Sequence, residues 1–213
     1  WAECDPDRPL GKIGDLTPEQ EQKKAEAAFL GAVAGCILGK PLECNPTLAE
    51  IREAAEAVGE WPLNDYVTKE LIDGVEKAKS PSLNCIRGNI DHVALDDDLN
   101  YTTLGMVAIE EYGINFTRKD LDVLWVNNLQ PGITFGPERR HMIKLAMNSM
   151  HPEEEDQSEI WAENWNAESE RCGAQIRADA YGYACPGRPA LAAEMAWRDA
   201  SRTHRRTGTY STM

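Results

Sequence analysis

Helical spacing of apolar residues dominates this chain, and strand-like alternation of apolar and polar residues is scarce. The clearest segment begins with a capping box at Thr17 and Gln20, has Pro18 at the first helical position, and ends at Gly39. Further helices are expected over 48–57, 69–79, 97–112, 118–127, 138–148 and 189–204, each bounded by Gly, Pro, Asn or Thr. The expected fold class is therefore all-α, with helices packed on helices.

Length and charge set limits on the class of protein. With 213 residues the chain can bury roughly 70% of its unfolded surface in one core, so we expect a lead-in segment over 1–16 and one domain over 17–213. A net charge of −14 repels phosphate backbones, which disfavours non-specific nucleic-acid binding. The longest apolar run, 27–38, is too short to span a bilayer, so no membrane association is expected.

The cysteines indicate the compartment. There are six cysteines without a CxxC pair, and the amino terminus lacks the basic and apolar regions of a signal peptide. Reduced thiols in a cytoplasmic protein are therefore expected.

Two further segments have ordinary structural interpretations. Gly31, Gly35 and Gly39 form a ridge without side chains, best explained by close helix packing and otherwise by the approach of a ligand. The stretch 152–170 is rich in Glu and Asp and has no basic residue, which is typical of a solvated insertion.

Three adjacent carboxylates stand at the expected start of the helix over 97–112. Asp96, Asp97 and Asp98 have apolar neighbours on both sides, so their mutual repulsion lies beside a buried helix. Two of them can serve as helix caps, because the free N–H groups and the dipole there favour negative charge. A divalent cation such as Mg²⁺ would account for the third. The residues alone leave a solvated cap and half of a metal site equally open.

Two other positions are candidates for a ligand site. Glu43 follows a glycine turn and a proline, and a lone glutamate there is most simply a surface residue. The segment 173–179 offers a glycine N–H and the Arg177 guanidinium to a phosphate. Arg177 could equally make an ion pair with Asp179 or in the core.

A histidine ends the last expected helix. The helical spacing places Trp197, Ala200, Ser201 and His204 on one face. The dipole at the carboxyl end of a helix favours a histidine by itself, so this position alone indicates no function.

Taken in order, these features resemble the ADP-ribosylglycohydrolase family, more narrowly its bacterial members with a triple-aspartate motif. The segment 35–43 fits the family pattern Gly-x-x-x-Gly-x-Pro-x-Glu, and Asp96-Asp97 fits its aspartate pair, although Leu95 replaces the usual Thr, Ser or Pro. The segment 173–179 resembles its glycine-containing loop, and 199–204 fits Asp-Ala-Ser-x-Thr-His. The resemblance spans residues 24–210.

The resemblance implies a single-domain helical bundle that hydrolyses the glycosidic bond between ADP-ribose and a modified target. It implies two Mg²⁺ ions in the complete protein, and an ADP-ribosylated protein or a small ADP-ribose conjugate as substrate. The residues implied are Asp96, Asp97 and Asp98 for metal, Glu43 and Asp97 for catalysis, and Gly173, Gln175, Arg177 and His204 for the ligand.

Two alternatives stay open: a non-catalytic relative that keeps the fold for binding or structure, and a hydrolase of another nucleotide sugar or nucleoside. The family's Gly-Gly-Asp-x-Asp-Thr cluster, which completes a two-magnesium centre, does not follow Asp179 in this sequence. We therefore expect the chain to be truncated before that cluster and to be inactive by itself.

Overall fold

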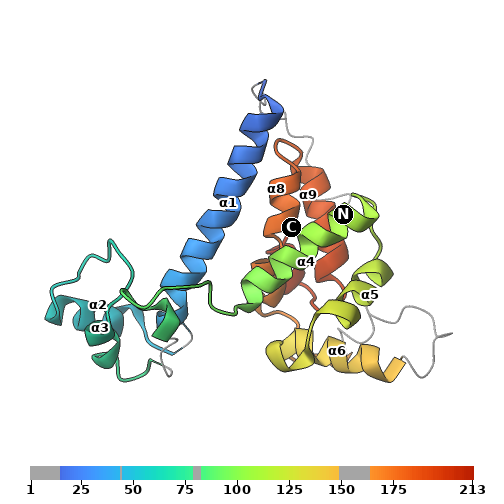
Figure 1. The fold of residues 1–213 in the computed structure, drawn as a ribbon. Coiled ribbons are helices and arrows are strands. Elements are labelled where there is room, and N and C mark those ends of the chain that lie inside the picture. The colour runs from blue at the N-terminus through green and yellow to red at the C-terminus, as the bar shows by residue number, and fades with distance from the viewer. Residues whose placement is uncertain (1–14, 44, 79–82, 149–163) are drawn as a thin grey trace. The chain divides into compact units, whose positions relative to one another are not determined.

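The computed structural model describes residues 15–43, 45–78, 83–148 and 164–213, and all the secondary structure in these residues is helical (Figure 1). The expected all-α fold class is confirmed. The expected lead-in over 1–16 and the acidic stretch over 152–170 lie largely outside the described residues. The helices are α1 (Pro18–Gly39), η1 (Lys40–Leu42), α2 (Leu48–Ala57), α3 (Lys69–Asp73), η2 (Leu83–Cys85), α4 (Asp97–Tyr112), α5 (Arg118–Asn128), η3 (Pro131–Ile133), α6 (Gly136–Asn148), η4 (Cys172–Arg177), α8 (Asp179–Ala184), α9 (Pro189–Ala200) and α10 (Thr207–Tyr210).

The described residues form two compact units, each with its own core. The single domain expected over 17–213 stays a prediction. The smaller unit is Glu26–Leu99, and the larger unit contains Asn100–Met213 and the start of α1. Buried apolar side chains gather in a separate cluster in each unit. Each unit is described by itself below.

The core of the larger unit is built around the indole of Trp125 on α5. Its ring stacks on Tyr101 of α4 with ring centroids 5.2 Å apart, and it meets the edge of His141 of α6. α5 packs against α6 and α9, and α8 packs against α9. Aromatic pairs in such geometry add to the stability that burial alone supplies.

The core of the smaller unit is aliphatic. Ala54 and Ala55 of α2 pack with Leu71 and Ile72 of α3. Thr47 and Glu50 form a capping box at the start of α2, and a threonine also caps α3, so side-chain oxygens satisfy the free N–H groups there.

Two helices end earlier than predicted. α3 stops at Asp73 instead of continuing to residue 79, because Gly74 ends it and the chain turns to bury Val75. α9 ends at Ala200, and the chain continues as a turn in which the His204 N–H still bonds to the Ala200 carbonyl at 2.8 Å. The other helix predictions agree with the structure within two residues.

The predicted capping box of α1 is confirmed. The Gln20 N–H bonds to Thr17 Oγ1, and Gln20 Oε1 accepts from the Thr17 N–H. The close packing expected along the ridge of Gly31, Gly35 and Gly39 is not found, because no described atom apart from the helix's own adjacent backbone lies within 4 Å of a Cβ built at these glycines.

The first helix is longer than the apolar run seen in the sequence. Over Pro18–Leu42 it is long and apolar enough to cross a membrane, by length and composition only. Core helices of soluble proteins and signal sequences meet the same criterion. The absence of membrane association therefore stays a prediction.

Gly105 allows α4 to approach α8 closely. A Cβ built at Gly105 would lie 2.9 Å from the Cβ of Ala180. We expect Gly105→Ala to lower the free energy of unfolding by about 1 kcal/mol or more, because the overlap outweighs the gain in helix propensity. Urea unfolding of the purified variant measures this.

The matched control is Gly182→Ala in α8, where a Cβ would meet nothing within 4 Å. That variant should be as stable as the parent or slightly more so. Equal stability of the two variants would contradict the close approach of α4 and α8.

Candidate functional site

The triple-aspartate run lies at the amino end of α4. Oδ1 of Asp96 accepts a hydrogen bond from the Asp98 N–H at 3.0 Å, so Asp96 caps the helix. Asp97 and Asp98 occupy the first turn, where the helix dipole favours their charge. The capping role predicted from the sequence is confirmed for Asp96.

A lysine at the start of η1 contacts this run within the smaller unit. Nζ of Lys40 donates to Oδ2 of Asp96 at 2.7 Å, and both side chains are largely buried. Burial alone would lower the pKa of Lys40, but the hydrogen bond with Asp96 and the charges of Asp96, Glu43 and Asp97 raise it. Glu43 is therefore close enough to the aspartates to act on the same ammonium group.

The remaining two carboxylates are crowded. Burial raises the pKa of Asp97, and the charge of Asp96 adds to this shift. Burial, the hydrogen bond with Asp96 and the charges of both neighbours raise the pKa of Asp98 to about 7. Carboxyl groups in this state gain from either a proton or a cation.

A thiol that the sequence did not single out joins this cluster. Sγ of Cys36 and carboxylate oxygens of Asp96 and Asp98 all lie within 4.8 Å of one another. The aspartate oxygens suit a hard cation such as Mg²⁺, whereas a thiolate favours softer ions such as Zn²⁺. The residues present therefore fit a divalent cation. In the sequence, Cys36 could have been linked to this cluster because it lies one helical turn before Lys40.

Asp98 should make stability depend on pH when no divalent cation is bound. Its pKa of about 7 lies above the ordinary 3.8, so the folded protein keeps a proton that the unfolded chain has lost. Ionisation therefore costs stability as the pH rises from about 4 to about 7, and the cost is complete above that range. Because the side chain is partly exposed, we expect Asp98→Asn to raise the unfolding temperature at pH 8 by only about 2–4 °C.

Thermal unfolding in excess chelator at pH 8 and pH 4 measures this effect, and the gain should vanish at pH 4. Glu53→Gln, at an exposed position of α2, is the matched control. A gain for Asp98→Asn that is equal at both pH values would contradict the crowding of the carboxylates.

The glycine-containing loop lies in the larger unit and is held by a buried ion pair. Arg177 is 1% exposed, and its guanidinium donates to Glu138 Oε1 at 2.6 Å, to the Gly173 carbonyl and to Thr203 Oγ1. Its Nε lies 3.1 Å from Asp199 Oδ1. Of the two alternatives for Arg177, the core ion pair is the one that the structure displays.

Gly173 lets a carboxylate approach the loop. A Cβ built there would lie 2.4 Å from Oε1 of Glu138, so no residue with a side chain fits without movement. The group that lies against Gly173 is the Glu138 carboxylate, and the approach of a phosphate to the Gly173 N–H stays a prediction. Gln175 of the same loop is exposed.

A second buried arginine extends the cluster. Arg202 donates to Oδ1 of Asp122 and to Oδ1 of Asp199, each at 2.7 Å, and its guanidinium lies over the Trp125 ring. Nε2 of His141 lies 2.6 Å from the same Asp122 oxygen. Burial would raise the pKa of Asp122, but the hydrogen bond with His141 and the charge of Arg202 lower it to about 2.

The sequence interpretation missed Glu138, Asp122, His141 and Arg202. The available signal was helical register: Glu138 and His141 share a stripe with the apolar Met142 and Leu145. Charged residues on an apolar stripe indicate either a buried cluster or a site.

The family model described as ADP-ribosylglycohydrolase matches residues 17–213. The chain belongs to the ADP-ribosylglycohydrolase family. The resemblance inferred from the motifs is confirmed at this level, whereas the bacterial triple-aspartate subgroup and the truncation stay predictions. No curated protein and no solved structure gives a significant match.

His204 is a motif residue of this ADP-ribosylglycohydrolase relative and is fully buried. Nδ1 lies 2.6 Å from Thr203 Oγ1. Burial, helped by the charge of Arg177, lowers the pKa of His204 to about 3, so the imidazole is neutral at pH 7. His204 lies in the larger unit, whereas Glu43 and the three aspartates lie in the smaller unit.

Removing Arg177 should destabilise this ADP-ribosylglycohydrolase domain strongly. Arg177→Met would leave Glu138 and Asp199 buried with fewer partners, and loss of one member of a buried ion pair typically costs about 3–5 kcal/mol. Chemical unfolding of the purified variant gives the cost.

Arg171→Met is the matched control, because Arg171 is exposed and its partner Glu168 is near the surface. It should change stability by less than about 1 kcal/mol. A similarly small cost for Arg177→Met would show that the buried cluster is dispensable.

Proposed function

We propose that the protein is a magnesium-dependent hydrolase that cleaves the glycosidic bond joining ADP-ribose to a modified target and releases ADP-ribose. Family membership suggests a hydrolase of this type. The observation that supports the finer proposal is the crowded Asp96-Asp97-Asp98 run at the start of α4, with Glu43 in the same electrostatic neighbourhood. Such a donor set suits a hard divalent cation.

In this proposal Asp96, Asp97 and Asp98 would hold the metal. When bound, Mg²⁺ orients the ribose hydroxyls and lowers the pKa of a water molecule. Lys40 holds Asp96 in place and limits its rotation.

Glu43 is assigned proton transfer. Its carboxyl group is exposed just past η1, where a water molecule or the leaving group can reach it. Asp97 is the second candidate base, because burial raises its pKa toward neutrality. Glycosidic bonds break through an oxocarbenium-like transition state, in which a proton must reach the leaving group or leave the attacking water.

The ligand contacts are assigned to the loop over 173–179. His204 is fully buried, so its assigned role is indirect, through Thr203, whose Oγ1 lies 2.6 Å from His204 Nδ1 and accepts from Arg177. Gln175 is exposed and can donate to or accept from the ligand directly. Arg177 holds the Gly173 carbonyl and thereby fixes the loop. The substrate is an ADP-ribosylated protein or a small ADP-ribose conjugate, and the compartment is the cytoplasm.

One observation favours the second candidate, a non-catalytic binding relative. The ammonium group of Lys40 already neutralises Asp96. Part of the negative charge that would attract a metal ion is therefore balanced by the protein itself. A module without metal would keep this pair unchanged. Magnesium should raise the unfolding temperature if the aspartates bind it, and should leave it unchanged in the non-catalytic relative.

The test of the proposed function is release of free ADP-ribose by the complete protein. Arginine-, serine- and nucleic-acid-linked substrates are compared, each with Mg²⁺ and with excess chelator. Turnover that needs Mg²⁺ supports the proposal, and the reactive substrate identifies the linkage. Metal-independent turnover, or none with any ADP-ribose linkage, would reject it.

Glu43→Gln should lower turnover by roughly 10²- to 10⁴-fold, the usual contribution of a proton-transfer group. Folding and metal binding should be unchanged, because the side chain is exposed and the amide has the same shape. Single-turnover release of ADP-ribose measures the effect, with Glu53→Gln as control. Parent-like rates in Glu43→Gln would remove this residue from the mechanism.

A further inference from the structure

Both carboxylate oxygens of Asp96 are engaged in the structure. Oδ1 accepts the Asp98 N–H at 3.0 Å, and Oδ2 accepts from Nζ of Lys40 at 2.7 Å. The first bond caps α4 through its backbone, so it persists as long as the helix begins at Asp97. A cation that binds Asp96 is therefore expected to enter at Oδ2, where the ammonium group of Lys40 lies.

A metal ion and the ammonium group compete for this oxygen. At the usual ligand distance of about 2.1 Å, an ion on Oδ2 would stand within about 5 Å of Nζ, and two cations that close repel each other. Water screens this repulsion poorly, because the side chains of Lys40 and Asp96 are only 19% and 7% exposed. Binding of a metal ion to Asp96 thus requires the ammonium group to leave.

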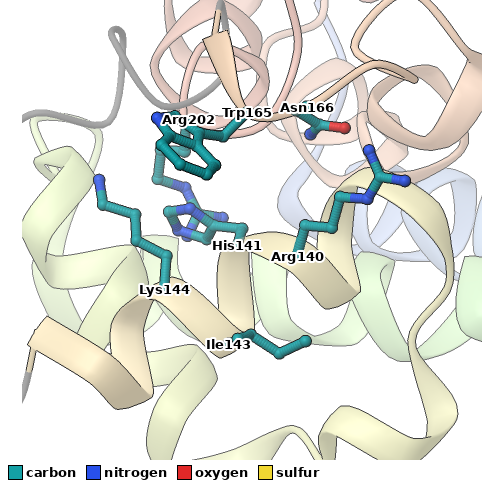
Figure 2. A pocket seen from close by; sticks show the side chains of 7 residues that line it. All are labelled: Arg140, His141, Ile143, Lys144, Trp165, Asn166 and Arg202. Atoms are coloured by element: carbon teal, nitrogen blue, oxygen red, sulfur yellow. The ribbon is translucent and has the colours of Figure 1, made fainter.

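The ammonium group of Lys40 can leave more easily than a buried arginine of the larger unit. Figure 2 shows Arg202 among the side chains that line a cavity beside α6. Arg202 is fully buried and pairs with both Asp122 and Asp199. Lys40 keeps part of its side chain at the surface, and its charge stands at the end of a flexible four-carbon stem. Its partner is therefore exchangeable.

A second carboxylate is placed to receive the ammonium group. Glu43 follows Lys40 by three residues, at the end of η1, and its charge already acts on the ammonium group. The side chain of Glu43 is exposed. A lysine that turns from Asp96 toward Glu43 moves into solvent and stays near a negative charge, which lowers the cost of leaving Asp96.

We propose that Lys40 is an internal competitor of the divalent cation, whose ammonium group occupies Asp96 in the metal-free protein and moves away when the metal ion binds. This inference rests on the proposed function, because it concerns the metal site assigned there to the three aspartates. The apparent affinity for the ion is lowered by the small fraction of molecules in which the ammonium group is away from Asp96. Lys40 is then the residue that sets the metal affinity.

Titration of the full chain with Mn²⁺ tests this, with the free ion counted by electron paramagnetic resonance. Carboxylate sites accept Mn²⁺ as well as Mg²⁺, and the measurement needs no substrate. Lys40→Met keeps the apolar stem without the charge, and should bind Mn²⁺ roughly tenfold more tightly than the parent or better. Lys40→Arg keeps the charge and should bind no more tightly than the parent.

Two further variants show where the gain arises. Lys77→Met is the matched control, because Lys77 lies in the same unit and pairs with Glu50 at 2.6 Å. It removes the same charge and should bind Mn²⁺ as the parent does. In the double variant Lys40→Met with Asp98→Asn, loss of a proposed ligand should abolish the gain.

A second measurement uses the parent protein and does not depend on the folding of a variant. Acetylation of Lys40 by an amine-reactive ester, followed by mass spectrometry, should become several-fold faster when Mn²⁺ is added. The reason is that the ammonium group leaves a largely buried ion pair for the surface. Lys77 is the internal control, and its acetylation rate should stay the same.

The results that overturn the inference differ from those that reject the proposed function. Equal or weaker Mn²⁺ binding by Lys40→Met, tighter binding by Lys40→Arg, or an unchanged acetylation rate of Lys40 in the metal-loaded parent overturns the inference alone. Absence of Mn²⁺ binding in both the parent and Lys40→Met rejects the inference together with the metal site. Tighter binding by Lys40→Met, with no release of ADP-ribose by the complete protein, supports the inference and rejects the proposed activity.

Discussion

Two guanidinium groups buried among three carboxylates organise the larger unit. Arg177 and Arg202 share Asp199, and each adds one further acid, Glu138 or Asp122. Both guanidiniums also lie over the Trp125 ring. Because ions in a low-dielectric interior are stable only when paired, this cluster fixes the relative placement of α5, α6, η4 and α9. The apolar core packs against that ionic framework.

The two acidic clusters of the protein are balanced differently. In the larger unit, arginines keep Asp122 and Asp199 ionised, and the pKa of each is lowered although burial opposes this. In the smaller unit, Lys40 pairs with Asp96 of the three aspartates, and the pKa values of Asp97 and Asp98 are raised. The first arrangement is complete without a ligand. The second gains from an added cation, which is why the proposed chemistry is assigned there.

Much of the fold follows from local sequence signals, and less of the site does. Thr17 and Thr47 place helix starts because their hydroxyls pair with free N–H groups nearby in the chain. The Asp96 cap was predictable for the same reason. The pairing of Arg202 with Asp122 joins residues 80 positions apart, and no local pattern specifies it. Likewise the sequence named Arg177 but left its partner open, because only packing selects Glu138 over Asp179.

The contact between Glu138 and Gly173 bears on how this loop can receive a phosphate. The Glu138 carboxylate lies against the position of a Gly173 Cβ, which would be 2.4 Å from Oε1. A carboxylate of the protein, Glu138 of α6, therefore already lies against the loop. If the loop receives a phosphate as proposed, that phosphate would compete with the Glu138 carboxylate for Arg177, and its affinity would be set by the difference between two anions at one arginine.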